Sequence, residues 1–258
     1  MLTTIDDVIA GAAEELDRLR IRRESGSTRA APERRAIFGP PDLARYIEHT
    51  VLKPEATPDA VTLLCAEARE HGLRAVCVNP LYVERAKAIL AGTDCLVVTV
   101  VGFPLGANLP EIKAREAVLA IRCGADEIDM VIPIGLLLGG GYQGVFQDIR
   151  AVVEASGTVP VKVILENALL NERQKVMACL LAERAGAAFV KTSSGFAKSG
   201  ATVDDVRIMK RVVGDRLGIK AAGGIRDFAT ARAMVDAGAT RIGTSASAAI
   251  VSGRLAGG

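Results

Sequence analysis

A repeated alternation of short apolar runs with longer helix-like segments dominates this chain and constrains its fold most strongly. Eight apolar or alternating runs of five to seven residues occur in order, and segments with helical periodicity separate them. Strands that alternate with helices indicate βαβ units and a parallel sheet. The eight expected strands are residues 47–52, 74–79, 95–101, 127–132, 161–166, 187–192, 218–222 and 240–244.

Eight strand–helix units predict an α/β protein built as a single (β/α)₈ TIM barrel. The expected helices between the strands are residues 58–71, 80–91, 109–123, 142–156, 169–185, 202–214 and 226–237. An open, doubly wound sheet of eight strands is the alternative. It is less favoured because no G-x-G-x-x-G follows the first strand.

The first 38 residues differ from the repeating units. Apolar residues at helical spacing predict a helix over residues 5–22, and the Arg-, Ser- and Gly-rich stretch 23–35 predicts a connector. We therefore expect residues 1–38 to form an N-terminal helical extension and linker, and residues 39–258 to form the barrel domain.

The composition of the 258 residues limits the classes of partner and site. Half of the residues are hydrophobic but only 3% are aromatic, which suits helices packed on a parallel sheet. A net charge of +2 predicts no nucleic-acid partner, and no apolar stretch is long enough for a membrane helix. Five scattered cysteines without C-x-x-C indicate a reduced, cytoplasmic chain, and two isolated histidines argue against a His-rich metal site.

Ionisable residues stand on four consecutive expected strands, near the ends where barrel active sites lie. In chain order they are Asp129, Lys162, Lys191 and Lys220. Side chains alternate along a strand, so Lys162 faces inward if Val161 and Val163 face the helices. The same alternation places Asp129 inside the barrel and the apolar Ile128 outside.

Three lysines on three consecutive strands predict a reactive amine. Neighbouring strands are ~4.8 Å apart, so Lys162 and Lys220 would flank Lys191. Nearby cations and burial both lower the pKa of an amine, and a neutral lysine can attack a carbonyl to form a Schiff base. We therefore expect Lys191 to be the nucleophile, with Lys220 lowering its pKa and transferring protons. Asp129 would orient Lys220 or share its proton. The alternative for any one lysine is a side chain that reaches solvent or pairs with a carboxylate.

Small residues and glycines follow the sixth, seventh and eighth expected strands. Barrels often bind phosphate with the loops after strands seven and eight, and glycine lets backbone N–H groups approach an anion. We therefore expect a phosphorylated ligand, although such glycines also occur in ordinary strand–helix turns. The expected ligand-binding residues are Lys162, Ser194, Gly195, Gly223, Gly224, Gly243 and Ser245.

Eight stretches between about residues 45 and 252 carry a resemblance to a known family. They are IEHTVLKPEAT, VCVNPLYV, VVGFPLGAN, GADEIDMVIPIG, VKVILENALL, FVKTSSGFAKSGAT, KAAGGIRD and TRIGTSAS. With these stretches the chain resembles the deoxyribose-phosphate aldolase family of class I aldolases. The resemblance implies a TIM barrel that reversibly cleaves 2-deoxy-D-ribose 5-phosphate to glyceraldehyde 3-phosphate and acetaldehyde, without a metal or organic cofactor.

The resemblance also implies roles for individual residues. The family's Schiff-base lysine falls on Lys191, its second essential lysine on Lys220 and its catalytic aspartate on Asp129. The family's strand-five lysine falls on Lys162. The implied protein is a cytoplasmic enzyme of deoxyribonucleotide catabolism that acts on a phosphorylated sugar and small aldehydes. We expect a homo-oligomer, either a dimer or a tetramer.

The chain departs from the family pattern at two polar positions and at its ends. Glu48 stands where the family usually has aspartate, and Asn167 stands where it usually has threonine. Residues 1–38 have no counterpart, and the tail lacks the C-terminal tyrosine that some members carry. Two other functions stay open. One is a phosphate-binding barrel isomerase or synthase that forms no imine, and the other is a non-catalytic barrel that binds a sugar phosphate.

Overall fold

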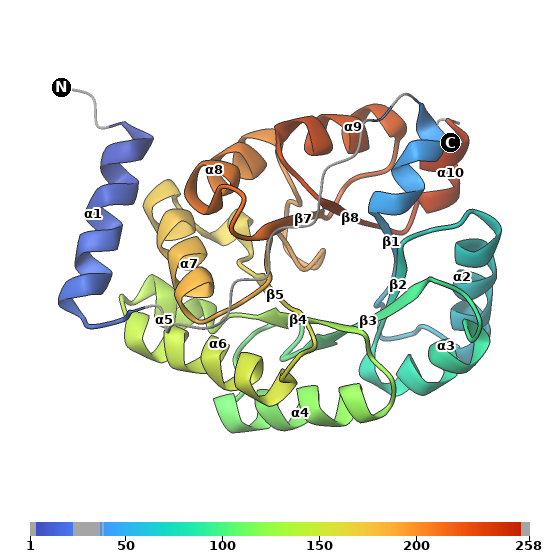
Figure 1. Cartoon of the computed structure of the whole chain (residues 1–258), viewed down its shortest axis with the longest axis horizontal. Helices are drawn as coiled ribbons and strands as arrows, with labels where there is room; N and C mark the ends of the chain where they lie inside the picture. The colour runs from blue at the N-terminus through green and yellow to red at the C-terminus, as the bar shows by residue number, and fades with distance from the viewer. Residues whose placement is uncertain (1–3, 23–36, 38, 254–258) are drawn as a thin grey trace.

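The computed structural model describes residues 4–22, 37 and 39–253, and its eight parallel strands close into a barrel ringed by helices (Figure 1). The strands pair in chain order, and Glu48 of the first pairs with Gly243 of the last, which closes the sheet. The predicted TIM barrel is therefore confirmed, and the open sheet is wrong. The strands are β1 (Ile47–Val51), β2 (Ala75–Val78), β3 (Leu96–Val101), β4 (Glu127–Val131), β5 (Val161–Ile164), β6 (Phe189–Lys191), β7 (Gly218–Ala222) and β8 (Arg241–Thr244).

Helices connect the strands close to the predicted positions. The longer ones are α1 (Ile5–Arg18), α2 (Pro58–Glu70), α3 (Val83–Ile89), α4 (Pro110–Arg122), α6 (Tyr142–Ser156), α7 (Glu172–Arg184), α8 (Val203–Val213) and α9 (Phe228–Ala237). Shorter elements add to this set, namely α5 (Ile134–Leu138), α10 (Ser247–Ser252) and the 3₁₀ turns η1 (Pro40–Tyr46), η2 (Pro80–Tyr82) and η3 (Asn167–Leu169). Sequence periodicity does not predict α5 and α10, because each is too short to show a helical repeat.

Side-chain caps begin several helices at the end of the barrel where the strands terminate. The hydroxyl of Thr57 accepts a hydrogen bond from the N–H of Ala60 at 3.2 Å, at the start of α2. The hydroxyl of Thr202 accepts one from the N–H of Asp205 at 3.1 Å, at the start of α8. Each cap satisfies an N–H group that has no partner within its helix, and so fixes where the preceding loop ends.

The main hydrophobic core fills the layer between the barrel and its helices. Val161, Val163 and Ile128 are buried in this layer, where the outer faces of β4 and β5 meet the helices. Asp129 and Lys162 alternate with them and contact each other on the opposite, inward face at 2.9 Å. The predicted alternation is therefore confirmed on both strands.

The inside of the barrel has two parts of different character. The part that we call the apolar interior comes from β2, β3 and the residue after β1, and contains Leu52, Ala75, Cys77, Val98 and Val100. The part that we call the charged interior comes from β1 and from β4 to β8, and contains Glu48, Glu127, Asp129, Lys162, Lys191, Lys220 and Arg241. All of these side chains are buried, so the charges must balance one another rather than rely on solvent.

Helix α1 packs on the outside of the barrel beside α7 (Figure 1). An ion pair joins Asp17 of α1 to Arg184 of α7 at 2.7 Å. The predicted N-terminal helix is confirmed, but it ends at Arg18 instead of residue 22 because the chain turns at Arg20, whose φ is 59°.

The division of the chain at residues 38 and 39 stays a prediction. The connector at residues 23–35 and the tail at residues 254–258 lie outside the described residues. Within the described part of the chain, no helix is both long enough and apolar enough to cross a membrane.

Candidate active site

A cavity of about 330 Å³ opens at the C-terminal ends of β1, β6, β7 and β8. Its wall contains Lys191 and Lys220, whereas Asp129 and Lys162 are fully buried in the charged interior and do not reach it. The structure also brings six predicted ligand-binding residues into this wall, namely Ser194, Gly195, Gly223, Gly224, Gly243 and Ser245. The residues that the sequence singles out therefore form one connected site.

Asp129 is the centre of the hydrogen-bond network below the cavity. Its Oδ2 accepts hydrogen bonds from Lys191 Nζ at 2.7 Å and from Lys220 Nζ at 2.6 Å. Its Oδ1 accepts one from Lys162 Nζ at 2.9 Å. Strand register explains this meeting, because Asp129 pairs with Lys162 across β4 and β5, and Lys191 pairs with Lys220 across β6 and β7. One buried carboxylate thus contacts all three lysines.

The same neighbours move the pKa values of these lysines in different directions. Burial is the largest influence on the pKa of Lys191 and lowers it, and Lys220 lowers it further although Asp129 opposes this. Burial also disfavours the charged form of Lys220, but Asp129 and Glu48 outweigh burial and raise its pKa. The pKa of Lys162 is raised as well, because Asp129 and the other carboxylates outweigh burial. Lys191 is therefore the lysine that becomes neutral most readily.

The carboxylate of Asp129 stays charged despite its burial. Burial alone would raise the pKa of this group, but the three lysines outweigh burial and hold the pKa well below its usual range. A charged carboxylate in a dry interior keeps neighbouring ammonium groups charged unless another influence opposes it. At Lys191, burial and Lys220 outweigh Asp129, whereas Lys162 and Lys220 each have at least one further carboxylate that raises the pKa.

Three further buried residues, Glu48, Glu127 and Arg241, complete the charged interior. Glu48 accepts a hydrogen bond from Lys220, and Glu127 lies 2.6 Å from the Nζ of Lys162. Arg241 lies 3.7 Å from Glu48 and 3.8 Å from Glu127. Sequence reasoning assigns no role to Glu127 or Arg241, and it identifies Glu48 only as a departure from the family pattern. Period-two alternation carries part of the signal, because Glu127 stands two residues before the central aspartate on the same face of β4.

The loop after β6 is held by Glu166 and Thr192. The N–H of Ser194 donates to Glu166 at 3.2 Å, and the Ser194 hydroxyl donates to the same carboxylate. The Thr192 hydroxyl donates to the carbonyl of Ala222 and accepts from its N–H, both at 3.1 Å. Glu166 has a φ of 59°, a left-handed conformation that non-glycine residues adopt where the surrounding structure fixes them. These contacts fix Ser194 at the edge of the cavity.

Gly223 and Gly224 form a turn after β7 that side-chain-bearing residues would fit poorly. Their φ values are 91° and 78°, which favour glycine. A Cβ atom on Gly223 would lie 2.9 Å from the Cα of Gly200, so this turn packs closely against the segment before α8. Successive backbone N–H groups at such a turn can form a concave surface for an anion. Phosphate binding here stays a prediction, and the place of the turn in the cavity wall supports it.

Sequence reasoning misses several residues of the cavity wall. Lys53, Phe196 and Arg226 line the cavity, and the Nζ of Lys53 lies 5.2 Å from the centre of the Phe196 ring. Arg226 stands two residues after Gly224, and a basic residue beside a glycine turn is a recognisable sign of an anion site. Lys53 is harder to find, because it stands between the end of β1 and Pro54, in a stretch that has no phosphate-loop pattern.

The two departures from the family pattern lie in different environments. Glu48 belongs to the charged interior, where it contacts Lys220. Asn167 instead donates a hydrogen bond from Nδ2 to Met209 Sδ at 3.4 Å, in the layer between the barrel and α8. We call Lys162, Lys191 and Lys220 the lysine cluster, and only the first departure contacts it. Among the described residues, no group of three or more His, Cys, Asp and Glu side chains is arranged to hold a metal ion.

Comparison with known proteins identifies the family. A model of the DeoC/LacD family of aldolases matches residues 44–257. Deoxyribose-phosphate aldolase of Streptococcus pneumoniae serotype 19F is 57% identical over 216 residues, which cover 84% of this chain and 98% of the relative. A solved structure described as the unique tetrameric structure of deoxyribose phosphate aldolase from Aeropyrum pernix is 30% identical with a TM-score of 0.79, and the match covers 96% of this chain and 97% of that chain. The chain belongs to the DeoC/LacD family of aldolases.

Proposed function

We propose that this chain is a class I deoxyribose-phosphate aldolase, which reversibly cleaves 2-deoxy-D-ribose 5-phosphate to D-glyceraldehyde 3-phosphate and acetaldehyde. Family membership and the 57% identity to a relative of that name support the substrate. The observation that carries the mechanism is the lowered pKa of Lys191 beside the raised pKa of Lys220. One lysine is thereby suited to act as a nucleophile, and its neighbour stays protonated and so carries a proton that can be transferred.

The reaction begins at the amine of Lys191. The neutral Nζ attacks C1, the aldehyde carbon of the open-chain sugar phosphate, and loss of water gives a protonated imine. A base then removes the proton of the C3 hydroxyl, and the C2–C3 bond breaks. The bonding electrons pass into the imine to give an enamine, and glyceraldehyde 3-phosphate leaves. Protonation of the enamine at C2 and hydrolysis of the new imine release acetaldehyde and regenerate the amine.

Asp129 and Lys220 are the groups that move protons in this proposal. Lys220 Nζ and Lys191 Nζ both contact Oδ2 of Asp129, at 2.6 Å and 2.7 Å, so protons have a short path between them. Lys162 holds the other carboxylate oxygen at 2.9 Å and fixes the orientation of Asp129. The groups are buried, so their charges act on the imine more strongly than they would in water.

The phosphate group of the substrate binds, in this proposal, at the far side of the cavity from Lys191. Gly223 and Gly224 offer backbone N–H groups there, and the side chain of Arg226 adds a positive charge. Ser245 lines the same wall after β8. The remaining predicted contacts, Ser194, Gly195 and Gly243, complete the wall of the same cavity.

Reductive trapping tests the proposal directly. Incubation with acetaldehyde and borohydride, followed by peptide mapping, is expected to give a two-carbon adduct on Lys191. Lys191→Met should abolish the adduct, whereas Lys198→Met changes an exposed lysine in the following loop and should leave it intact. Cleavage of 2-deoxy-D-ribose 5-phosphate should be lost in the first variant only. Folded protein that gives no adduct at neutral pH would contradict the imine mechanism.

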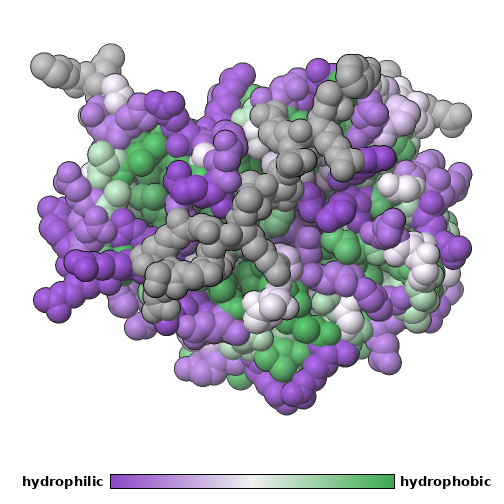
Figure 2. Space-filling view, in the orientation of Figure 1, coloured by the Kyte–Doolittle hydropathy of each residue, from purple (hydrophilic) through white to green (hydrophobic). Residues whose placement is uncertain are grey.

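We further infer that the protein is a cytoplasmic homo-oligomer, either a dimer or a tetramer. The relative from Aeropyrum pernix is described as tetrameric, and the free cysteines of this chain suit a reducing compartment. Helix α4 and the residue before it carry the exposed Leu109, Ile112 and Leu119. Hydrophobic side chains are visible toward the lower edge of Figure 2, where α4 lies. Light scattering during gel filtration is expected to give at least twice the 27.0 kDa chain mass, and a monomer would contradict the inference.

A further inference from the structure

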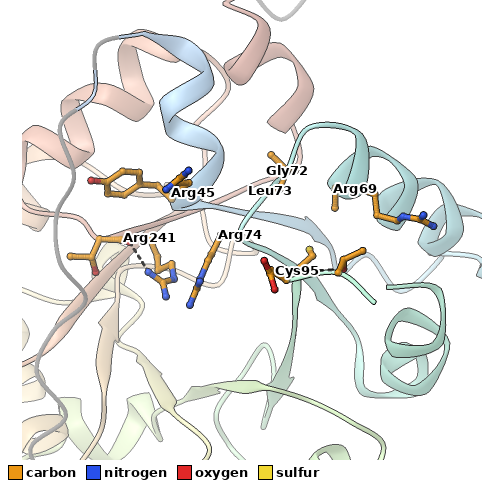
Figure 3. Close-up of a pocket in the computed structure, with 12 residues that line it drawn as sticks. Arg45, Arg69, Gly72, Leu73, Arg74, Cys95 and Arg241 are labelled. Carbon is orange, nitrogen blue, oxygen red and sulfur yellow. Dashed lines mark hydrogen bonds between the residues drawn. The ribbon is translucent and has the colours of Figure 1, made fainter. Parts of the chain in front are cut away.

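A second and larger cavity opens at the opposite end of the barrel, where the strands begin (Figure 3). Its volume is about 750 Å³, which lies within the ~300–1,000 Å³ range of small-molecule sites. The segments before β1, β2 and β3 and the first residue of β8 line it. None of the residues considered above for the aldolase reaction lines this cavity except Arg241, which forms part of both regions.

The wall of this cavity has a strong excess of positive charge. Arg45, Arg69, Arg74 and Arg241 line it, and Asp94 is the one acidic side chain among its lining residues in the described chain. No carboxylate of the described residues lies within ion-pair distance of the first three arginines, which are exposed. Arg241 is 6% exposed, and its Nε has no hydrogen-bond partner within the described residues. Arg45, Arg69 and Arg74, which have no carboxylate partner among the described residues, together attract an anion.

The sequence that precedes η1 carries a net positive charge of its own. Residues 23–36 lie outside the described residues and carry four arginines and two glutamates. Their net charge is +2, so this stretch of sequence brings no excess of negative charge. The complementary anion is therefore expected to come from another molecule.

We propose that this cavity binds a small compound with two or more phosphate charges, of the size of pyrophosphate or a nucleoside diphosphate. Figure 3 shows Arg74 and Arg241 with their guanidinium groups directed to the same side, with Arg45 above them. A guanidinium donates two parallel hydrogen bonds to a phosphate, so Arg45 and Arg74 hold the phosphate groups and Arg241 forms the floor. Arg69 extends away from the other three in this view and is given no role.

Arg241 connects this cavity to the lysine cluster. Its guanidinium lies 3.7 Å from Glu48 and 3.8 Å from Glu127, and these carboxylates contact Lys220 and Lys162. An anion on Arg241 adds negative charge beside the cluster and weakens the hold of Arg241 on both glutamates. The ammonium form of the buried lysines then gains stability at the expense of the neutral amine that the reaction requires. An anion bound in this cavity is therefore expected to slow the aldolase reaction, a consequence that rests on the proposed function.

Calorimetric titration of the full chain with pyrophosphate tests the site without any turnover. We expect one binding event per chain, with inorganic phosphate binding more weakly because it reaches fewer arginines. The double variant Arg45→Ala/Arg74→Ala should bind at least tenfold more weakly, and Arg74→Lys, which keeps the charge but loses the planar donor pair, should fall between the two. Arg122→Ala removes an exposed arginine from α4, outside the cavity, and should bind like the parent chain. Circular dichroism shows whether each variant is folded.

Two outcomes would overturn the site. One is the absence of binding to the parent chain. The other is a double variant that binds pyrophosphate as tightly as the parent chain does. If pyrophosphate also competes with the sugar phosphate, the anion binds in the aldolase cavity instead. The link through Arg241 has its own test, since kcat/KM should fall by about fivefold at saturating pyrophosphate and constant ionic strength. An unchanged kcat/KM in the presence of confirmed binding would overturn the link, and an inactive enzyme would leave the titration result valid.

Discussion

The apolar interior and the charged interior occupy the same barrel, are equally buried and are built by strands with the same alternation. They differ only in which residues stand at the inward positions. Val98 and Val100 face inward from β3, whereas Asp129 and Lys162 do so from β4 and β5. The apolar interior has few polar groups and excludes water. It therefore strengthens the electrostatic interactions within the charged interior. The comparison shows that one fold holds both the charged groups and the low-dielectric surroundings that strengthen their interactions.

The two interiors also differ in what they contribute to stability. Burial of Val98 and its neighbours is favourable in itself, because apolar surface leaves water. Burial of a cluster such as Lys162, Asp129 and Glu127 costs solvation energy that ion pairing only partly returns. The charged interior therefore contributes less to stability than the apolar parts of the molecule, which keep it folded.

The largest effect is expected from Lys191→Met, which makes the reactive position apolar. Loss of the nucleophile should lower kcat/KM for 2-deoxy-D-ribose 5-phosphate by at least about a thousandfold. The fold should survive, because an uncharged side chain of similar length suits a buried site. A coupled assay for glyceraldehyde 3-phosphate measures the rate, with Lys198→Met as the control. Residual activity above a tenth of the parent value would show that another residue is the nucleophile.

Lys220→Met should have the next largest effect, a fall in kcat/KM of about 100- to 1,000-fold, because it removes the proposed acid. Its pH profile is the more informative readout. Burial and Lys220 both lower the pKa of Lys191, while Asp129 raises it, so removal of Lys220 should raise that pKa. The rise of kcat/KM with pH should then occur at higher pH than in the parent chain. A shift of this rise to lower pH would contradict the electrostatic role of Lys220.

Glu48→Gln tests the place where the two interiors meet, because Glu48 belongs to β1 and contacts Lys220 in the charged interior. The change leaves a buried cation with one fewer carboxylate, so the free energy of unfolding should fall by about 3 kcal/mol. We expect kcat/KM to fall by about tenfold, since a neutral amide holds the Lys220 ammonium group in position less firmly than a carboxylate does. Glu48→Asp keeps the carboxylate and is the matched control. Equal losses in both variants would point to side-chain length, not charge, as the cause.

Val98→Ala tests the apolar interior and should have the smallest effect on the reaction. It removes two buried methyl groups and should lower the free energy of unfolding by about 2 kcal/mol, as measured by denaturant titration. No charge changes, so kcat/KM and its pH profile should stay within about twofold of the parent values. A shifted pH profile in this variant would mean that the apolar wall sets the lysine pKa values more strongly than the neighbouring charges do.

The sequence predicts the barrel and the inward side of β4 and β5 because both depend on short-range alternation. Val161 and Lys162 must face opposite ways wherever they are placed, and a closed sheet leaves only one inside. The catalytic roles of Lys191, Lys220 and Asp129 stay predictions, although their placement around one carboxylate is what those roles require.

The parts that the sequence did not predict depend on contacts between distant strands. Whether Arg241 lies near Glu48 and Glu127 depends on the stagger of the closed barrel, which no local pattern records. The left-handed backbone of Glu166 is another such feature, because its partner Ser194 lies 28 residues further along the chain. The short helices α5 and α10 were missed for a different reason, since each has too few residues to show a period.

Closure of the barrel by β1 and β8 has a consequence for how the molecule is made. Glu48 and Lys220, which hydrogen-bond in the finished site, are separated by 172 residues, and the pairing of β1 with β8 spans a still longer stretch. Contacts of such range form slowly, because a long loop must close before they bring any gain. During synthesis β1 leaves the ribosome long before its last partner exists. The lysine cluster therefore stays hydrated in the growing chain, and its buried environment forms only after β8 has been synthesised.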